Sequence, residues 1–168
     1  VPRSRSASKA QISFTINTTS NTSSLTLAAG LVCIGASESS TITFSIPSSI
    51  TSTVVNGVAT FNNIDVYQGT FLRKQFLVDG SLDQRFLLDN SFIDSSTIVV
   101  KVTGPNETTL GREYLRADNI LNIDSTSEIY LIQEVQDEKY ELLFGDGYFG
   151  KKLENGSTIT ATCIITDG

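Results

Sequence analysis

The chain has 168 residues and a mass of 18.2 kDa, a length that fits a single domain. Its net charge is −6, and its short basic pieces, such as Arg3 with Arg5 and Lys151 with Lys152, make no continuous stripe. Nucleic-acid binding requires a basic surface that neutralises phosphates, so we expect no nucleic-acid partner. Histidine is absent, which excludes a Ser-His-Asp triad, a histidine general base and imidazole ligands for a metal.

The composition favours many short strands joined by polar turns. Charged residues make up only 18% of the chain, and serine, threonine and asparagine supply most of the polar surface. No stretch has the length of a membrane-spanning helix, and no signal peptide with an apolar centre is present, so we expect no membrane partner. The two cysteines, Cys33 and Cys163, stand in apolar, strand-like stretches. We expect buried free thiols there, favoured over a disulfide.

The first half of the chain predicts a series of strands. Residues 11–18 alternate cleanly between apolar and polar side chains, which is the pattern of a half-buried strand. Further strands are predicted by alternation or by β-branched content at residues 25–27, 31–34, 41–46, 61–67 and 70–78.

One hairpin is marked by its turn. Asn56 and Gly57 stand between β-branched residues, and an Asn-Gly pair favours a two-residue hairpin turn because both central residues need positive φ. Pro47 ends the strand before this hairpin because proline has no N–H to donate to a sheet.

The second half is less regular. Residues 79–94 indicate a short helical turn or an irregular excursion, and residues 111–123 indicate a connector with one short helix near residues 114–120. The other predicted strands are 97–103, 130–135, 139–144 and 157–166. Nine to eleven strands without a sustained helical period predict an all-β fold, and an antiparallel β-sandwich with irregular crossovers is preferred over a closed barrel.

The segment Phe144-Gly145-Asp146-Gly147 suggests a calcium or phosphate site at first sight. Calcium needs six to eight oxygen ligands, and the following residues, Tyr148 to Lys152, supply no clustered carboxylates. The glycine spacing also differs from that of phosphate-binding loops. We therefore expect Asp146 to accept hydrogen bonds from its own turn, and we predict no metal, no cofactor and no catalytic residue.

Two further patterns concern the surface. The aspartates at positions 79, 83, 89 and 94 fit no calcium loop, and we expect a solvated loop there. Charges are sparse in residues 11–18 and 157–166. If these strands lie at sheet edges, they lack protection by charge, which is typical of a piece that packs against partners.

The last forty residues carry a resemblance to a known family. Tyr140-Glu-Leu-Leu is followed by Phe144 to Gly147, then by Gly150-Lys151, by Gly156, and by an alternating strand that ends near residues 166–168. This order resembles the baseplate J-like proteins, specifically the baseplate wedge subunit of contractile-tailed (myovirus) bacteriophages. Residues 8–11 and 25–30 resemble the family's first strand and turn, with Ala28 where proline is usual.

The resemblance implies a structural role without bond chemistry. It implies a virion protein of the tail baseplate, assembled in the host cytoplasm, whose partners are other wedge proteins and a second copy within the full-length homodimer. It makes Phe144, Gly145, Asp146, Gly147, Gly150, Lys151 and Gly156 a structural turn. Residues 1–9, which begin Val-Pro-Arg-Ser, are then a linker from a preceding helical region, and residues 10–168 a single β domain within a longer protein.

The alternative function is a carbohydrate-binding or adhesive β-sandwich. It rests on the Ser/Thr/Asn-rich surface and on tyrosines expected to be exposed at positions 67, 114, 130 and 148, because aromatic rings can stack on sugars. Tryptophan, the usual platform for such stacking, is absent. A hydrolase ranks third because scattered carboxylates are the only general bases available.

Overall fold

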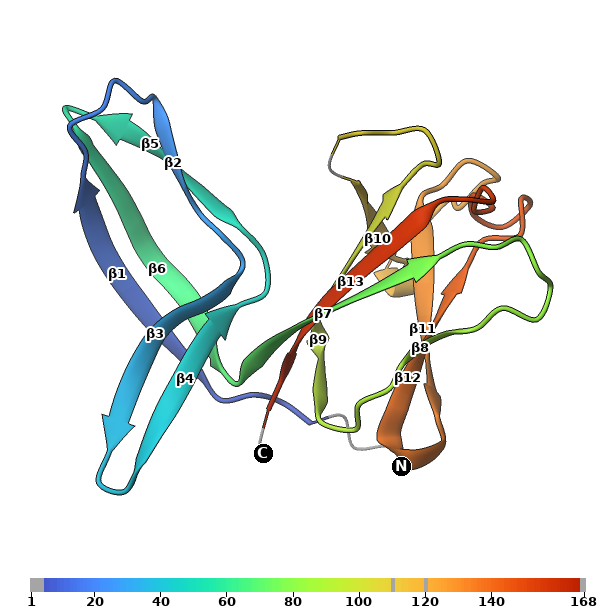
Figure 1. The fold of residues 1–168 in the computed structure, drawn as a ribbon, viewed down its shortest axis with the longest axis horizontal. Coiled ribbons are helices and arrows are strands. Elements are labelled where there is room, and N and C mark those ends of the chain that lie inside the picture. The colour runs from blue at the N-terminus through green and yellow to red at the C-terminus, as the bar shows by residue number, and fades with distance from the viewer. Residues whose placement is uncertain (1–4, 110, 120, 167–168) are drawn as a thin grey trace.

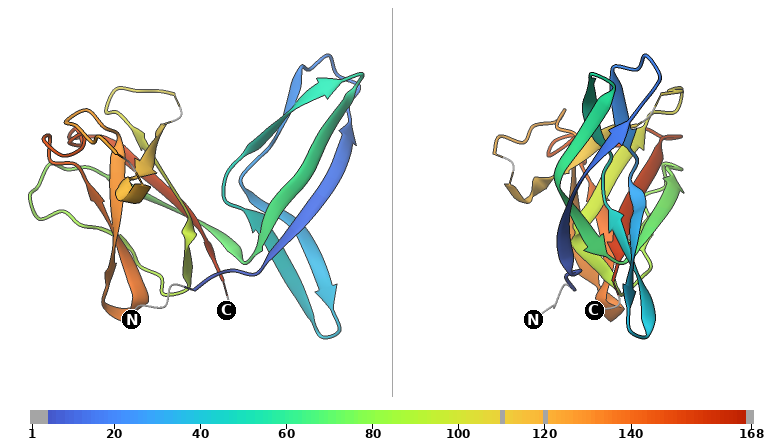
Figure 2. Two further views of the ribbon diagram at one scale, coloured as in Figure 1. Left: turned by 180° about the vertical axis from the view of Figure 1, so that it is seen from behind. Right: turned by 90° about the vertical axis from the view of Figure 1, so that its left-hand side faces the viewer.

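The computed structural model describes residues 5–109, 111–119 and 121–166. The predicted all-β fold is confirmed, since these residues form thirteen strands and two single-turn 3₁₀ segments in two largely antiparallel, sandwich-like sheets. Each sheet has its own hydrophobic cluster, so the fold consists of two lobes that lie side by side (Figures 1 and 2). Whether both fold as one unit, as predicted for residues 10–168, stays a prediction.

The first lobe contains six strands: β1 (Lys9–Asn17), β2 (Ser24–Leu27), β3 (Gly30–Ser37), β4 (Ser40–Ile46), β5 (Ile50–Val55) and β6 (Val58–Gln68). β6 is its central strand, with β1 along one side and parts of β5 and β4 along the other. β2 pairs with β5 and β3 pairs with β4, so β2–β3 and β4–β5 form one long hairpin with a bend in the middle. β1 and β3 are both outer strands of this sheet.

The apolar face of each strand fills the first lobe. Its buried centre is formed by Ile46, Ala59, Phe61, Ile64 and Val66. The alternating side chains of β1 point to this centre, and the rings of Phe14 and Phe61 stack with their centroids 5.1 Å apart. The predicted hairpin turn is confirmed, because Asn56 and Gly57 have φ angles of 52° and 76° and join β5 to β6.

The second lobe contains the remaining strands: β7 (Thr70–Leu77), β8 (Phe86–Leu88), β9 (Ile93–Thr103), β10 (Arg112–Arg116), β11 (Ile129–Val135), β12 (Lys139–Phe144) and β13 (Thr158–Ile165). They form one sheet in the order β7-β13-β9-β10-β11-β12-β8, in which only β10 and β11 run parallel. The last strand of the chain therefore lies between β7 and β9. β8 falls within the predicted irregular excursion and is a strand that the sequence did not reveal.

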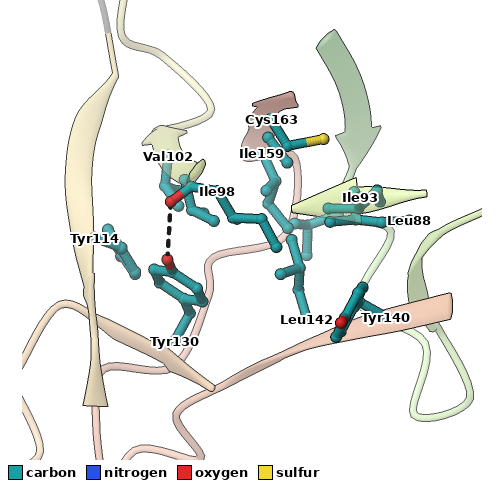
Figure 3. Packing of buried hydrophobic residues seen from close by; sticks show 13 residues of the cluster. Leu88, Ile93, Ile98, Val102, Tyr114, Tyr130, Tyr140, Leu142, Ile159 and Cys163 are labelled. Carbon is teal, nitrogen blue, oxygen red and sulfur yellow. Dashed lines mark hydrogen bonds between the residues drawn. The ribbon is translucent and has the colours of Figure 1, made fainter. Parts of the chain in front are cut away.

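The second lobe buries the larger core, shown in Figure 3. Side chains from all seven strands meet there, and Val100, Leu142 and Ile159 are almost fully buried. The hydroxyl of Tyr130 donates a hydrogen bond of 3.4 Å to the carbonyl oxygen of Ile98, so its polar end is satisfied inside the core. The rings of Phe76 and Phe86 pack edge to face with their centroids 5.6 Å apart, which brings the outer strands β7 and β8 together.

The chain crosses between the lobes at Gly69. A side chain there would overlap the carbonyl oxygen of Ile165 and would lie 2.7 Å from a methyl carbon of Ile164. The N–H of Gly69 donates to Thr43, and the N–H of Gln68 donates to Ser8, so the outgoing and returning chains are bonded side by side. Only glycine allows this close approach of backbones.

Residues 5–8 belong to the second lobe. Ala7 is buried, and its N–H donates a 2.8 Å hydrogen bond to Asp94, which is 2% exposed. Asp94 also accepts hydrogen bonds from the N–H and hydroxyl of Ser96. The expectation that Asp94 lies in a solvated loop was therefore wrong. The first lobe is an insertion between residue 8 and residue 70, and the rest of the predicted linker, residues 1–4, lies outside the described residues.

Two smaller expectations are also settled. The short helix predicted near residues 114–120 is a single 3₁₀ turn at Ala117–Asn119, because β10 occupies the positions before it. Cys33 and Cys163 are both free, as predicted, but only Cys163 is buried and Cys33 is half-buried. Burial raises the pKa of Cys163 to about 12.

Replacing Asp94 tests the docking of the first residues. We expect Asp94→Ala to lower the free energy of unfolding by about 2–4 kcal/mol, because it leaves the buried N–H of Ala7 without an acceptor and removes the acceptor of the Ser96 N–H. Urea denaturation measures this loss, and tryptic cleavage after Lys9 should become faster. Asp89→Ala is the matched control, since Asp89 is an exposed partner of Lys139. An equal loss of stability in both variants would contradict the assignment.

Candidate functional site

The segment from Phe144 to Lys151 begins where β12 ends. Phe144 anchors it, because its ring lies edge to face with Phe86 at 5.6 Å and with Tyr114 at 6.0 Å. These contacts fix the end of β12 over the core of the second lobe. The chain then turns away from the sheet and comes back at Lys152, which forms a parallel bridge with Gly145.

Gly145 and Gly150 allow the two arms of the turn to touch. A side chain on Gly145 would overlap the carbonyl group of Gly150 and would lie 2.6 Å from its Cα atom. Gly150 has a φ of +87°, and a side chain on it would lie 2.9 Å from the buried side chain of Ile129. Both positions therefore require glycine, one for space and the other for space and backbone angle.

Asp146 holds the turn from within, as predicted. Its Oδ1 atom accepts hydrogen bonds from the N–H groups of Phe149 at 2.8 Å and Tyr148 at 2.9 Å. These two bonds, that from Phe149 first, lower the pKa of Asp146 below its usual value of 3.8. Gly147 has a φ of +92° and donates its N–H to the carbonyl of Gly150. The Asp146 carboxylate is thus hydrogen-bonded to the backbone of its own turn.

A second turn, at residues 124–127, supports the first. The carbonyl of Asp124 accepts the N–H of Gly150 at 2.9 Å, and the carbonyl of Ser127 accepts the N–H of Lys151 at 2.8 Å. Asp124 is itself held like Asp146, because its Oδ1 atom accepts both the hydroxyl and the N–H of Thr126, which lowers its pKa. The two turns form one hydrogen-bonded unit, which we call the paired turns (residues 124–127 and 144–151).

The sequence did not predict this partner. Asp124-Ser-Thr-Ser is the kind of segment in which an aspartate bonds its own turn, and that was the available signal. The contact between residues 124–127 and 144–151 depends on the tertiary fold.

Gly156 lies apart from the paired turns. Its φ is +87°, its N–H donates to Val78, and a side chain on it would lie 3.1 Å from the ring of Pro105. It therefore shapes the entry to β13 against two other loops. The structure brings Phe144, Gly145, Asp146, Gly147, Gly150 and Lys151 together and places Gly156 at a separate corner of the same lobe.

The paired turns expose an aromatic tip. Tyr148 is 88% exposed and Phe149 about half exposed. Phe149 and the outward residues Leu131 and Leu143 line a shallow, mostly apolar hollow of about 140 Å³. Asp146 is the carboxylate at this hollow, and its Oδ1 is bonded to the turn. This arrangement can contact another molecule but brings no group of titratable side chains together.

The four aspartates of the second acidic pattern do not converge. Asp79 accepts hydrogen bonds from Ser81, Asp83 is exposed, Asp89 pairs with Lys139, and Asp94 accepts the N–H of Ala7. In the described part of the chain, no three histidine, cysteine or acidic side chains are grouped as a metal would require.

Two expectations about the surface require correction. Most of the predicted strand 157–166 is β13 (Thr158–Ile165), which lies inside the sheet, so its low charge reflects burial between neighbours. Most of the predicted strand 11–18 lies in β1 (Lys9–Asn17), which is an outer strand, as the edge argument assumed. Of the tyrosines expected to be exposed, Tyr114 and Tyr130 are core residues at 4% exposure. A large aromatic ring in an alternating strand can face either side, and in these two strands the apolar face points inward.

Comparisons with known proteins do not assign the chain to a family. Neither a protein-family model nor a curated protein sequence matches the chain. Within the residues that the structure describes, no helix is long and apolar enough to cross a membrane.

Alanine at two glycines of the turn separates lack of space from backbone strain. We expect Gly145→Ala to destabilise the chain by about 3 kcal/mol, because its methyl group meets backbone that cannot move away. Gly147→Ala should cost only about 1 kcal/mol, since it adds a strained φ but its methyl group would find its nearest neighbour at 3.7 Å. Thermal and urea unfolding measure both. Equal losses would show that the two arms of the turn do not touch.

The hydrogen bonds to Asp146 predict an acid-sensitive turn. Because its pKa is lowered in the folded chain, the stabilisation is present above the unfolded value of 3.8 and is lost as the pH falls through the folded pKa. The protection factors of the Tyr148 and Phe149 amides should therefore fall in acid. Asp146→Asn keeps an acceptor oxygen but cannot titrate, so its protection should not change over this range. A wild-type turn with constant protection would exclude the role of the carboxylate.

Proposed function

We propose that this chain is a structural component of a phage tail baseplate wedge, which assembles with other wedge subunits into the ring that controls sheath contraction. The observation that carries the proposal is the backbone contact between Gly145 and Gly150. In the family that the chain resembles, the Phe-Gly-Asp-Gly segment and the following Gly-Lys are a structural turn. Here each of Gly145, Gly147 and Gly150 is required by space or by backbone angle, and Asp146 bonds the turn.

The proposed mechanism is mechanical. Two β lobes with separate cores transmit a rearrangement of their neighbours as rigid pieces, and no covalent step is involved. The proposal places the protein in the virion, after assembly in the host cytoplasm. Its partners are other wedge proteins, with a homodimer in the longer protein. The buried positions of Tyr114 and Tyr130 leave the carbohydrate-binding alternative with Tyr67, which is half-buried, and the exposed Tyr148.

Immunogold electron microscopy tests the proposal directly. Antibodies raised against this chain are applied to purified, intact phage whose genome encodes it, and to the same phage after sheath contraction. We expect gold at the end of the tail distal to the capsid, and none when the serum is first absorbed with the chain. Gold on the capsid or on the length of the sheath would contradict the proposal.

An activity assay provides the second test. The purified chain is incubated with peptidoglycan and with a bacterial surface polysaccharide, and released reducing ends are measured. We expect no release above that of heat-denatured chain. Release by the native chain would replace the mechanical role with an enzymatic one.

A further inference from the structure

β3 presents a long free edge without charges. It is the terminal strand of the first-lobe sheet and pairs with β4 along its other side. Neither Gly30–Ser37 nor Ser40–Ile46 contains a charged residue, and the nearest charge along the chain is Glu38 in the turn between them. Natural sheets usually protect such an edge with charged side chains, proline or a short strand. The only irregularity of β3 is a bulge between Leu31 and Cys33, which leaves Cys33 onward regular.

The same strand exposes large apolar side chains. Leu31 is 59% and Ile34 is 63% exposed, which are high values for large apolar side chains in a strand. Ile34 lies opposite Thr43 of β4, so it already has a neighbour on one side and none on the other. A strand added beside β3 would cover Ile34 and would satisfy the free backbone groups.

The other outer strands are better protected. β7 carries Arg73 and Lys74 in its middle, β8 has only three residues and follows Arg85, and β2 has only four residues. β1 is long, but it begins with Lys9 and its most exposed large apolar residue, Ile16, is 39% exposed. Among the described strands, β3 therefore combines length, neutrality and exposed apolar surface most fully.

We propose that β3 pairs with β3 of a second copy of this chain, in an antiparallel arrangement about a two-fold axis near Ile34. The neutral edge allows a second acidic copy to approach and to pair with the same strand about a two-fold axis, and the position of Glu38 selects the antiparallel direction. The chain is acidic, so two copies repel each other over most of their surfaces, and the neutral edge is where they can approach. Antiparallel pairing puts the two Glu38 side chains at opposite ends, roughly 25 Å apart or about three screening lengths, whereas parallel pairing would put them side by side.

The two-fold axis places Ile34 next to its own copy. In an antiparallel pair, directly opposite residues point to the same face of the sheet, so a strand that pairs with its copy has one residue opposite itself. Ile34 is the exposed residue nearest the middle of β3. The inference rests on the proposed function only in treating the chain as an assembly protein, and it assigns the contact between copies to a defined edge.

Sedimentation velocity of the full chain under reducing conditions tests the contact. One strand pair is smaller than a standard interface, so we expect a reversible dimer at about 0.1 mM. Ile34→Lys should weaken dimerisation at least tenfold, because it brings two like charges together at the axis. Leu77→Lys is the matched control, since Leu77 is equally exposed at the end of β7, and it should not change dimerisation.

Disulfide trapping tests the register independently of that charge. In a Cys33→Ser background, Ile34→Cys should form a disulfide-linked dimer under mild oxidation, and Val55→Cys, which is equally exposed elsewhere in the lobe, should not. A monomeric wild-type chain, a dimer unaffected by Ile34→Lys, or open-ended oligomers would each overturn the inference. None of these outcomes bears on where gold labels the virion, so the two proposals fail separately.

Discussion

The contact between the backbones of Gly145 and Gly150 determines the geometry of the second lobe at its outer end. Because the two arms of the turn touch there, the N–H groups of Gly150 and Lys151 point outward. They donate hydrogen bonds to the carbonyl oxygens of residues 124 and 127. Ile129, which begins β11, packs against Gly150 on the inner side. One close approach thus ties the end of β12 to the start of β11 and leaves the aromatic tip on a rigid support.

The two lobes differ in their cores and in how the chain enters them. The second lobe holds the larger core and gathers residues 5–8, whose buried bond to Asp94 returns the chain to the sheet. The first lobe projects from it through two bonded chain segments at Ser8 and Gln68. A rigid body with a projecting, weakly charged sheet is a reasonable shape for a protein that is held by neighbours, and this is the physical basis of both proposals.

Local sequence signals predicted much of the fold and part of the site. The alternation of β1, the turn at Asn56-Gly57 and the bonds of Asp146 all depend on residues close together in the chain, where propensity and spacing are informative. The burial of Asp94 and the support given by residues 124–127 could not be predicted in this way, because each depends on segments that only the tertiary fold brings together. β8 was missed because three residues are too few to show a period.

Amide hydrogen exchange on the wild-type chain tests the central claim, that the paired turns are a locked part of the sheet rather than a surface loop. If it is correct, the amides of Gly147, Gly150 and Lys151 will exchange as slowly as those in the middle of β11 and β12 and will open with them. Exchange of these three amides at rates close to those of an unstructured peptide, with β11 and β12 still protected, would contradict it.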